Sequence, residues 1–169
     1  MAEIFKEYLI KQKKSSKDVL MQTLIMGAAA VLIIIAFLLG GAFLGPVIIL
    51  IVLFGAGTLF IKFNREYEYI LTNNELDIDV IYNKSKRKRV TTIDMKKIEA
   101  MVSIKDTNNQ GKIERFNKLI NASDNNDGAD TYAIISSQDN TLCKILITPN
   151  ASFLNELYKQ APHKVIKKI

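Results

Sequence analysis

The chain has 169 residues, of which 24% are charged, and a formal net charge of +6. Its single cysteine excludes an internal disulfide and is typical of a reducing compartment. This length allows either one ordinary domain or a smaller domain with a membrane anchor. The apolar residues decide between the two, because they are concentrated near the N-terminus instead of being spread along the chain.

Residues 1–18 form a basic N-terminal arm. In its segment EIFKEYLIKQKK, lysines lie on one face of a would-be helix and apolar residues lie on the other. The apolar residues, at helical spacing, are Ile4, Phe5, Tyr8 and Leu9. This pattern predicts a short amphipathic helix lying among lipid headgroups. A disordered, lysine-rich tail is an equally good interpretation.

Two long apolar runs follow the arm, at residues 19–39 and 43–63. Each contains about 20 residues of low polarity, enough for a helix to cross a hydrocarbon core of roughly 30 Å. No charged residue occurs in them before Lys62. The second run argues against a cleaved signal peptide. The sequence therefore predicts a transmembrane hairpin over residues 19–63, with a turn at Gly40–Gly41 and with Pro46 in the first turn of the second helix.

Positive charge flanks the predicted hairpin at both of its ends. Five lysines precede the first run, Lys62 and Arg65 close the second, and the link between the runs is uncharged. Positive flanks tend to stay in the cytoplasm. We therefore expect a two-span protein of the cytoplasmic membrane, with both termini and the region from residue 64 onward in the cytoplasm.

Residues 64–162 are predicted to form a mainly β domain. EYEYIL (66–71) and ELDIDVIY (75–82) alternate apolar and polar residues, which predicts two antiparallel strands joined by a turn at Asn73–Asn74. This register places Glu68 directly opposite Asp79 on an acidic face. Like charges in that position are destabilising, so the face needs cations from another part of the chain.

The rest of this domain is predicted to contain three more strand regions and a final helix. The strand regions are 89–94, 96–104 and a hairpin of 131–137 with 142–148. Between them, residues 105–130 are a long polar insertion, in which GKIERFNKLI is expected to form a short helix. The C-terminal helix begins near residues 148–150 and ends at Pro162, and residues 163–169 are a basic tail.

The run KSKRKR, at residues 84–89, has five positive charges in six positions. A nucleic-acid interface normally adds aromatic platforms or a recognition helix, so we do not expect nucleic acid as a partner. If Val90 lies on the apolar face, the preceding loop has an odd number of residues, and a three-residue loop places Arg89 opposite Asp79. The predicted structural charge pairing therefore involves Glu68, Asp79, Arg87 and Arg89.

The lysines of the same run have a different predicted role. The second strand returns from the Asn73–Asn74 turn, which brings the loop at 83–88 back toward the headgroups. Near an anionic leaflet each Lys or Arg contributes about 1 kcal/mol of attraction. The lysines of the N-terminal arm share that surface. We therefore expect membrane-surface contacts from Lys11, Lys13, Lys14, Lys17, Lys84, Lys86 and Lys88.

The sequence offers little for catalysis or metal binding. His163 is the only histidine, Cys143 lies within a predicted strand, and no Gly-rich phosphate loop or metal-spaced His/Cys cluster occurs. The loop at 124–128 is similar to a calcium loop, but Ile134 stands where Ca²⁺ binding requires Glu. We therefore expect no enzymatic activity, no cofactor and no metal site.

Two family resemblances fit this organisation. The segments Tyr69–Thr72 with Leu76, Lys84–Arg89 and Ile93–Glu99 resemble bacterial membrane-anchored pleckstrin-homology (PH) proteins. That resemblance implies a curved antiparallel sheet closed by a C-terminal helix. EYEY, ELDID, KSKRKR and APHKV resemble an uncharacterised family of two-span membrane proteins of anaerobic Gram-positive bacteria. This second resemblance covers nearly the whole chain and implies the same architecture without an assigned activity.

The expected architecture is a two-helix transmembrane hairpin plus a cytosolic, mainly β, PH-like domain with a C-terminal α-helix. Its expected function is that of a membrane-anchored interaction or scaffold module with an unidentified protein partner. A sensor of anionic lipid headgroups is the first alternative, and a regulator or enzyme of envelope metabolism is the second. The small residues of the two spans are also compatible with a homo-oligomer.

Overall fold

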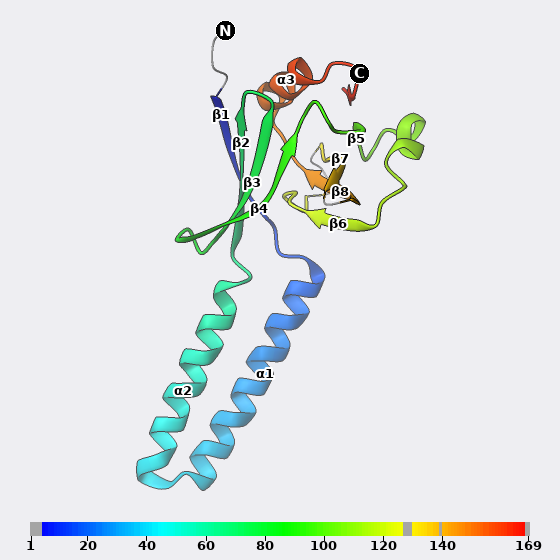
Figure 1. Ribbon diagram of the computed structural model, residues 1–169. Helices are drawn as coiled ribbons and strands as arrows, with labels where there is room; N and C mark the ends of the chain where they lie inside the picture. The colour runs from blue at the N-terminus through cyan, green and yellow to red at the C-terminus, as the bar shows by residue number, and fades with distance from the viewer. Residues whose placement is uncertain (1–4, 127–129, 139, 168–169) are drawn as a thin grey trace. The chain divides into compact units, whose positions relative to one another are not determined.

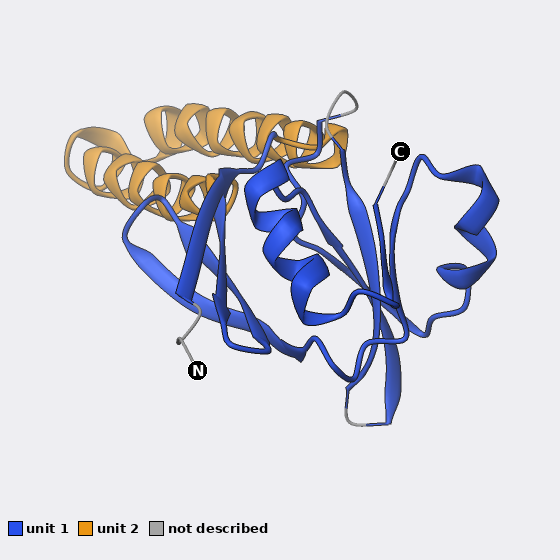
Figure 2. Ribbon diagram, turned by 90° about the horizontal axis from the view of Figure 1, so that it is seen from above, with its two compact units in different colours: residues 1–13, 66–169 blue, residues 14–65 orange. Residues whose placement is uncertain are grey.

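The computed structural model describes residues 5–126, 130–138 and 140–167, and the chain divides into two compact units (Figures 1 and 2). The hairpin unit is Lys14–Arg65 and contains two long helices. The PH-like unit combines Met1–Lys13 with Glu66–Ile169 and contains two sheets and a third helix. The chain therefore begins in the PH-like unit, leaves it to form the helical hairpin, and then returns.

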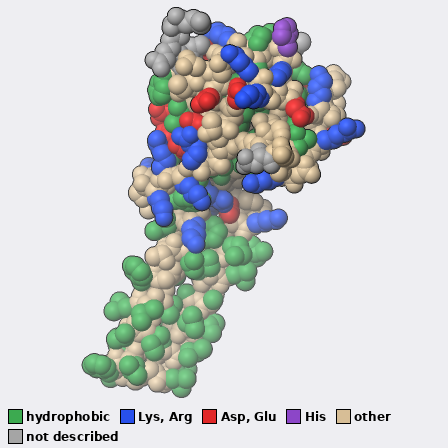
Figure 3. Space-filling view, viewed as in Figure 1, with side chains coloured by type: hydrophobic (Ala, Val, Ile, Leu, Met, Phe, Trp, Pro, Cys, Tyr) green, Lys and Arg blue, Asp and Glu red, His purple; other side chains and the backbone are tan. Residues whose placement is uncertain are grey.

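The hairpin unit consists of α1 (Ser16–Leu39) and α2 (Gly41–Ile61), both long and apolar enough to cross a membrane. Within these two helices only Ala36 and Gly45 are buried, and hydrophobic side chains cover the helix surfaces in Figure 3. So much exposed apolar surface is unfavourable in water and favourable in lipid. The predicted spans agree with the two helices to within three residues at each end.

The link between the helices requires glycine. A Cβ atom at Gly40 would overlap the carbonyl oxygen of Ala36, and Gly41 has a φ of +57°. Both conditions exclude ordinary side chains without rearrangement. The prediction that Pro46 lies in the first turn of the second helix is wrong, because α2 begins at Gly41 and Pro46 falls inside it.

Four strands form the first sheet, in the order β1-β2-β3-β4 (Figure 1). Asn73 and Asn74 join β2 to β3, and Asn73 has a φ of +53°, which asparagine tolerates. A three-residue loop, 83–85, joins β3 to β4. The predicted two-residue turn and the predicted odd loop are therefore both present. The strands are β1 (Phe5–Lys11), β2 (Arg65–Thr72), β3 (Glu75–Tyr82) and β4 (Lys86–Asp94).

Strand β1 is the largest departure from the sequence-based prediction. An amphipathic helix or disordered tail was expected over residues 1–18, but residues 5–11 form a strand that pairs antiparallel with β2, from Phe5 opposite Thr72 to Lys11 opposite Glu66. Ile4 lies outside the described residues. The pairing is non-local, because residues 12–64 separate the two strands in the sequence. The membrane hairpin is thus an insertion between two neighbouring strands of one sheet.

Five strands form the second sheet, in the order β6-β8-β7-β5-β9. The β7–β8 hairpin is antiparallel, as predicted, whereas β6 pairs with β8 and β9 pairs with β5 in parallel. The strands are β5 (Ala100–Ser103), β6 (Lys118–Asn121), β7 (Tyr132–Gln138), β8 (Thr141–Ile147) and β9 (Val165–Ile166).

Two segments of the second sheet correct the sequence-based assignments. GKIERFNKLI does not form a helix: a 3₁₀ helix, η1 (Thr107–Lys112), overlaps its start and β6 its end. The predicted basic tail contains β9, whose Val165 is buried. Both β6 and β9 depend on parallel partners far along the chain, which local periodicity does not reveal.

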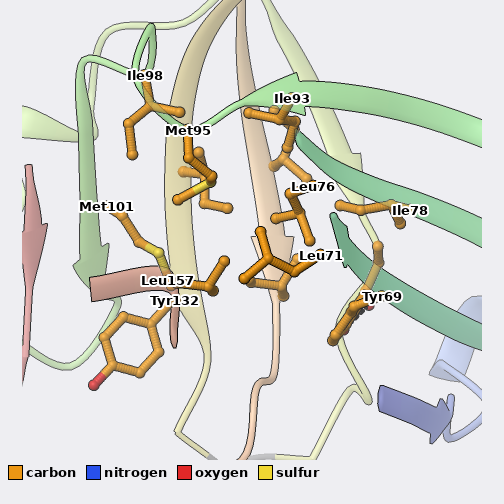
Figure 4. Close-up of a cluster of buried hydrophobic side chains, with 14 of the residues drawn as sticks. Tyr69, Leu71, Leu76, Ile78, Ile93, Met95, Ile98, Met101, Tyr132 and Leu157 are labelled. Atoms are coloured by element: carbon orange, nitrogen blue, oxygen red, sulfur yellow. Dashed lines mark hydrogen bonds between the residues drawn. The ribbon is translucent and has the colours of Figure 1, made fainter. Parts of the chain in front are cut away.

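Helix α3 (Ala151–Gln160) completes the core between the two sheets. The Asn150 side chain accepts a 2.7 Å hydrogen bond from the backbone N–H of Phe153, which caps its first turn. Figure 4 shows side chains from both sheets and from α3 in contact. The fully buried members of this cluster include Tyr69, Leu71, Leu76, Ile78, Ile93, Met101, Ile134, Ile145, Phe153 and Leu157.

Candidate functional site

The β3–β4 loop lies at the end of the first sheet from which the chain leaves for both helices. β1 ends there at Lys11, and β2 begins there at Arg65. β3 runs back along β2 after the Asn73–Asn74 turn, so residues 83–85 return to the same end. We call Lys11, Lys84, Lys86 and Lys88 the basic end. Figure 3 shows Lys and Arg side chains gathered over the β3–β4 hairpin.

The β3–β4 loop is a tight turn with an unusual backbone. Asn83 and Lys84 both have positive φ values, +48° and +57°, and the N–H of Ser85 donates to the carbonyl of Tyr82 at 3.1 Å. For a residue such as lysine the left-handed conformation costs about 1–2 kcal/mol. The turn holds the Lys84 side chain exposed at its tip.

The register of β3 with β4 sends lysines and arginines to opposite faces. Lys86 and Lys88 lie opposite Tyr82 and Val80, while the intervening arginine alternates to the other face. Arg89 lies opposite Asp79, the position expected from a three-residue loop. The run KSKRKR is therefore divided by its own strand geometry into two sets of cations.

The arginines cover the acidic face of the sheet. Arg87 ion-pairs with Glu68, and Arg89 ion-pairs with Asp79 and, at 2.5 Å, with Asp77. The carboxylates of Glu68 and Asp79 are 4% and 5% exposed, whereas the two arginines are about half exposed. The guanidinium groups thus lie over the carboxylates. The structure brings together all four residues of the predicted charge pairing.

This burial perturbs the ionisation of the face. Burial raises the pKa of Glu68, a hydrogen bond with the Glu7 side chain raises it further, and the charge of Arg87 opposes both effects. Burial lowers the pKa of Arg89, but its hydrogen bonds and its attraction to Asp79 and Asp77 outweigh that and leave the pKa raised. The pKa of Glu68 is therefore higher in the folded chain than in the unfolded chain. Protonation of Glu68 stabilises the fold, and this contribution grows as the pH falls through the range between the two pKa values. Glu7 was missed in the sequence because β1 was not recognised as a strand.

The remaining lysines of the predicted membrane contact are divided between the two units. Lys11 ends β1, and Lys13 Nζ donates to Asn126 Oδ1 at 2.9 Å within the PH-like unit. Lys14 Nζ donates to Gln22 Oε1 at 3.0 Å within the hairpin unit, and Lys17 lies in the first turn of α1. The PH-like unit therefore contains five of the seven predicted lysines.

Two of the residues considered for catalysis or metal binding, Cys143 and Asp124, are buried or hydrogen-bonded within the fold. Cys143 is buried in β8. Asp124 Oδ1 accepts from the N–H of Asn126 at 3.0 Å and from Thr148 Oγ1 at 3.2 Å, so the first acidic residue of the calcium-like loop bonds within the fold. Gly128 lies outside the described residues. Across residues 5–126, 130–138 and 140–167, no group of three or more His, Cys, Asp or Glu side chains could hold a metal ion.

Comparison with known proteins places this architecture in one family. No curated protein and no solved structure matches the chain. A family model described as "Bacterial PH-like domain (DUF6106)" matches residues 2–167, a range that includes β1, the helical hairpin, both sheets and α3. The inserted hairpin is therefore part of what the family model describes. The chain belongs to this family of bacterial PH-like domains.

Proposed function

We propose that the protein is a membrane-anchored interaction module without catalytic activity of its own. Its PH-like domain is held at the cytoplasmic face and contacts anionic lipid headgroups through the basic end. One observation carries this proposal: the β3–β4 loop lies at the same end of the sheet as the two connections to the membrane hairpin. At that end β1 and β2 connect to the two helices through only a few residues each.

The pairing of β1 with β2 supports the proposed topology. Residues 5–11 precede both helices and residues 65–72 follow them, yet the two segments form one antiparallel ladder. Strands in one ladder occupy the same side of a membrane, so the chain must cross an even number of times between them. The lysines before α1 and the cations after α2 favour the cytoplasmic side.

The charge state of the basic end supports the lipid contact. Arg87 and Arg89 are engaged by carboxylates, whereas no ion pair within the described parts of the chain involves Lys84, Lys86 or Lys88. All three are exposed. At about 1 kcal/mol each near an anionic leaflet, they contribute roughly 3 kcal/mol of attraction. Because the membrane helices already tether the domain to the surface, this attraction does not have to offset the cost of bringing the domain there from solution.

An environment-sensitive fluorophore on the β3–β4 loop tests the lipid contact. The full-length Ser85→Cys variant, with Cys143 replaced by Ala, is labelled and reconstituted in vesicles of zwitterionic lipid, with or without anionic lipid as a minor component. We expect the emission to shift to the blue when anionic lipid is present and to return as salt increases, because headgroup attraction is screened. Replacing Lys84, Lys86 and Lys88 by Ala should abolish the shift.

The matched control removes three other lysines of the PH-like unit: Lys105, Lys112 and Lys118. This variant loses the same net charge and should retain the shift. Emission that does not respond to anionic lipid, or responds equally in both triple variants, would overturn the proposed lipid contact.

A protein partner is a second candidate, favoured by a polar groove beside β4. β4 is an edge strand of the first sheet, and next to it lies a groove of about 420 Å³. Gln138 donates across this groove to Thr91 and to the carbonyl of Thr92. An extended segment of another protein could add to such an edge through main-chain hydrogen bonds. The groove is lined by Thr91, Thr92, Asp94, Lys97, Ser136, Ser137 and Gln138.

A further inference from the structure

The two residues that follow β1 are bound by the loop that follows β6. This loop reaches Gln12 and Lys13, just before α1 begins at Ser16. We call the contact between residues 12–13 and 122–126 the clasp. Its hydrogen bonds run from Lys13 N to Asp124 O (2.8 Å), Asn125 Nδ2 to Lys13 O (3.1 Å), Gln12 Nε2 to Ser123 O (3.0 Å) and Lys13 Nζ to Asn126 Oδ1 (2.9 Å).

The clasp loop is held in shape by its own side chains. Asn121 Oδ1 accepts from both the N–H and the hydroxyl of Ser123, at 3.0 and 2.7 Å. Asn125 has a φ of +56°, a conformation that asparagine adopts more readily than most residues. The loop is thus preformed to present its carbonyls and the Asn125 amide to the chain leaving β1.

The same loop is tied to a buried polar group between the two sheets. The Tyr69 hydroxyl donates to the carbonyl of Ala122 at 2.6 Å and accepts from the N–H of Thr148 at 3.1 Å. Thr148 Oγ1 donates in turn to Asp124 Oδ1. Tyr69 is fully buried, and burial raises the pKa of its phenol, so the hydroxyl keeps its proton. We call Tyr69, Ala122, Asp124 and Thr148 the hub.

Both connections to the membrane hairpin reach this hub. The first runs from α1 through Lys13 and the clasp to Asp124. The second runs from α2 through β2, the strand that contains Tyr69. At the hairpin side, Arg65 Nη2 lies 2.7 Å from Asp18 Oδ1, which joins the start of α1 to the end of the connection after α2. The two connections therefore form a closed ring of covalent and hydrogen-bonded links.

We infer that the clasp is a transmission element, through which displacement of the first membrane helix reaches the hub between the two sheets. Lys13 cannot move away from the loop without breaking bonds to Asp124 and Asn125. Asp124 cannot move without disturbing Thr148 and the buried Tyr69 hydroxyl. Leaving such buried groups unsatisfied is unfavourable, so the hub rearranges with the clasp as a unit. This inference rests on the membrane anchorage of the proposed function and is independent of its lipid contact.

Bilayer thickness provides a perturbation that acts on the helices alone. Hydrophobic mismatch changes helix tilt, so the full-length protein is compared in nanodiscs of short-chain and long-chain zwitterionic lipid. The readout is hydrogen exchange of the peptide containing the amide of Thr148, which donates to Tyr69. We expect its exchange rate to differ by about fivefold or more between the two bilayers, the lower end of typical couplings between sites.

Two variants break the clasp at different bonds. Asn125→Ala removes the side-chain bond to the Lys13 carbonyl, and Gln12→Ala removes the bond to the Ser123 carbonyl. In both variants the dependence on bilayer thickness should shrink to about twofold or less while β7 and β8 stay protected. That change corresponds to a coupling free energy lowered by more than half. Asn109→Ala, which removes a 2.8 Å bond to Asp106 in a different polar loop, should leave the dependence unchanged.

Two results would overturn the inference. Exchange at Thr148 that is the same in both bilayers excludes transmission to the hub. A dependence that persists in both clasp variants shows that another route carries it. Because every bilayer in this experiment is zwitterionic, a failed lipid contact at the basic end does not affect the result.

Discussion

A protein from which residues 2–11 have been deleted is expected to lose the folded PH-like domain while keeping its membrane helices. The deletion removes β1, with the buried Ile10 and the partly buried Tyr8, which contacts Tyr69 and Phe153. Burial of two large side chains contributes about 3–5 kcal/mol. The ladder to β2 contributes about 1 kcal/mol per hydrogen bond. Together these terms approach the whole stability of a typical domain, about 5–15 kcal/mol.

The comparison that isolates β1 uses two soluble chains. One is the fragment 66–169, and the other joins residues 1–11 to residues 66–169 through an Asn-Gly turn. Lys11 and Glu66 are paired neighbours, so a two-residue turn can replace the whole membrane hairpin. We expect the joined chain to unfold cooperatively on heating, as measured by circular dichroism, and the fragment to show no such transition. Equal melting temperatures for the two chains would show that β1 is dispensable.

Arg89→Glu is expected to destabilise the PH-like domain by about 2–3 kcal/mol, less than the loss of a fully buried ion pair, because the Arg89 side chain is half exposed and solvent screens its charge. The substitution leaves Asp79 buried without its cation and adds a third negative charge beside Asp77. For a domain of this size the melting temperature should fall by roughly 10 °C or more. The measurement is thermal unfolding of the full-length protein in nanodiscs, followed by the near-ultraviolet signal of the tyrosines.

Two further variants separate charge pairing from a general effect of charge. Lys88→Glu makes the same change one residue earlier, on the opposite face of β4, and should alter stability by only about 0.5 kcal/mol. The exchange of both partners, Arg89→Glu with Asp79→Arg, should restore part of the lost stability. Recovery stays incomplete because Asp77 keeps a like charge beside it. A double variant no more stable than Arg89→Glu alone would show that Arg89 and Asp79 are not coupled.

Local patterns in the sequence predicted the elements whose partners are close along the chain. Strands β2 and β3 alternate cleanly and are joined by asparagines, of which Asn73 adopts a positive φ. An odd loop was needed to keep Val90 on the apolar face, and a loop of three residues then placed Arg89 opposite Asp79, the pairing that the structure has. The two spans were recognised because an uncharged apolar run of about 20 residues is long enough to cross a bilayer as a helix.

Local sequence patterns did not predict the strands whose partners are distant along the chain. FKEYLIK has apolar residues on both faces: Ile10 is buried in the core, while Phe5 and Leu9 are exposed. That arrangement also satisfies helical spacing, and the partner strand lies beyond the membrane hairpin. β6 and β9 have parallel partners, for which no short turn gives a signal. The clasp and the hub were missed for the same reason, since they require β1 and β6 to be in place.

We propose a topology in which a two-span hairpin is inserted between two strands of a PH-like domain that lies on the cytoplasmic side. Single-cysteine variants of the full-length protein test this topology most directly, with a membrane-impermeant maleimide applied to intact bacterial cells and to inverted membrane vesicles. With Cys143 replaced by Ala, Ser85→Cys reports on the β3–β4 loop, and Phe43→Cys reports on the first turn of α2, next to the link between the helices. The account predicts that position 85 reacts only in inverted vesicles and position 43 only in intact cells. Reaction of both positions from the same side would contradict it.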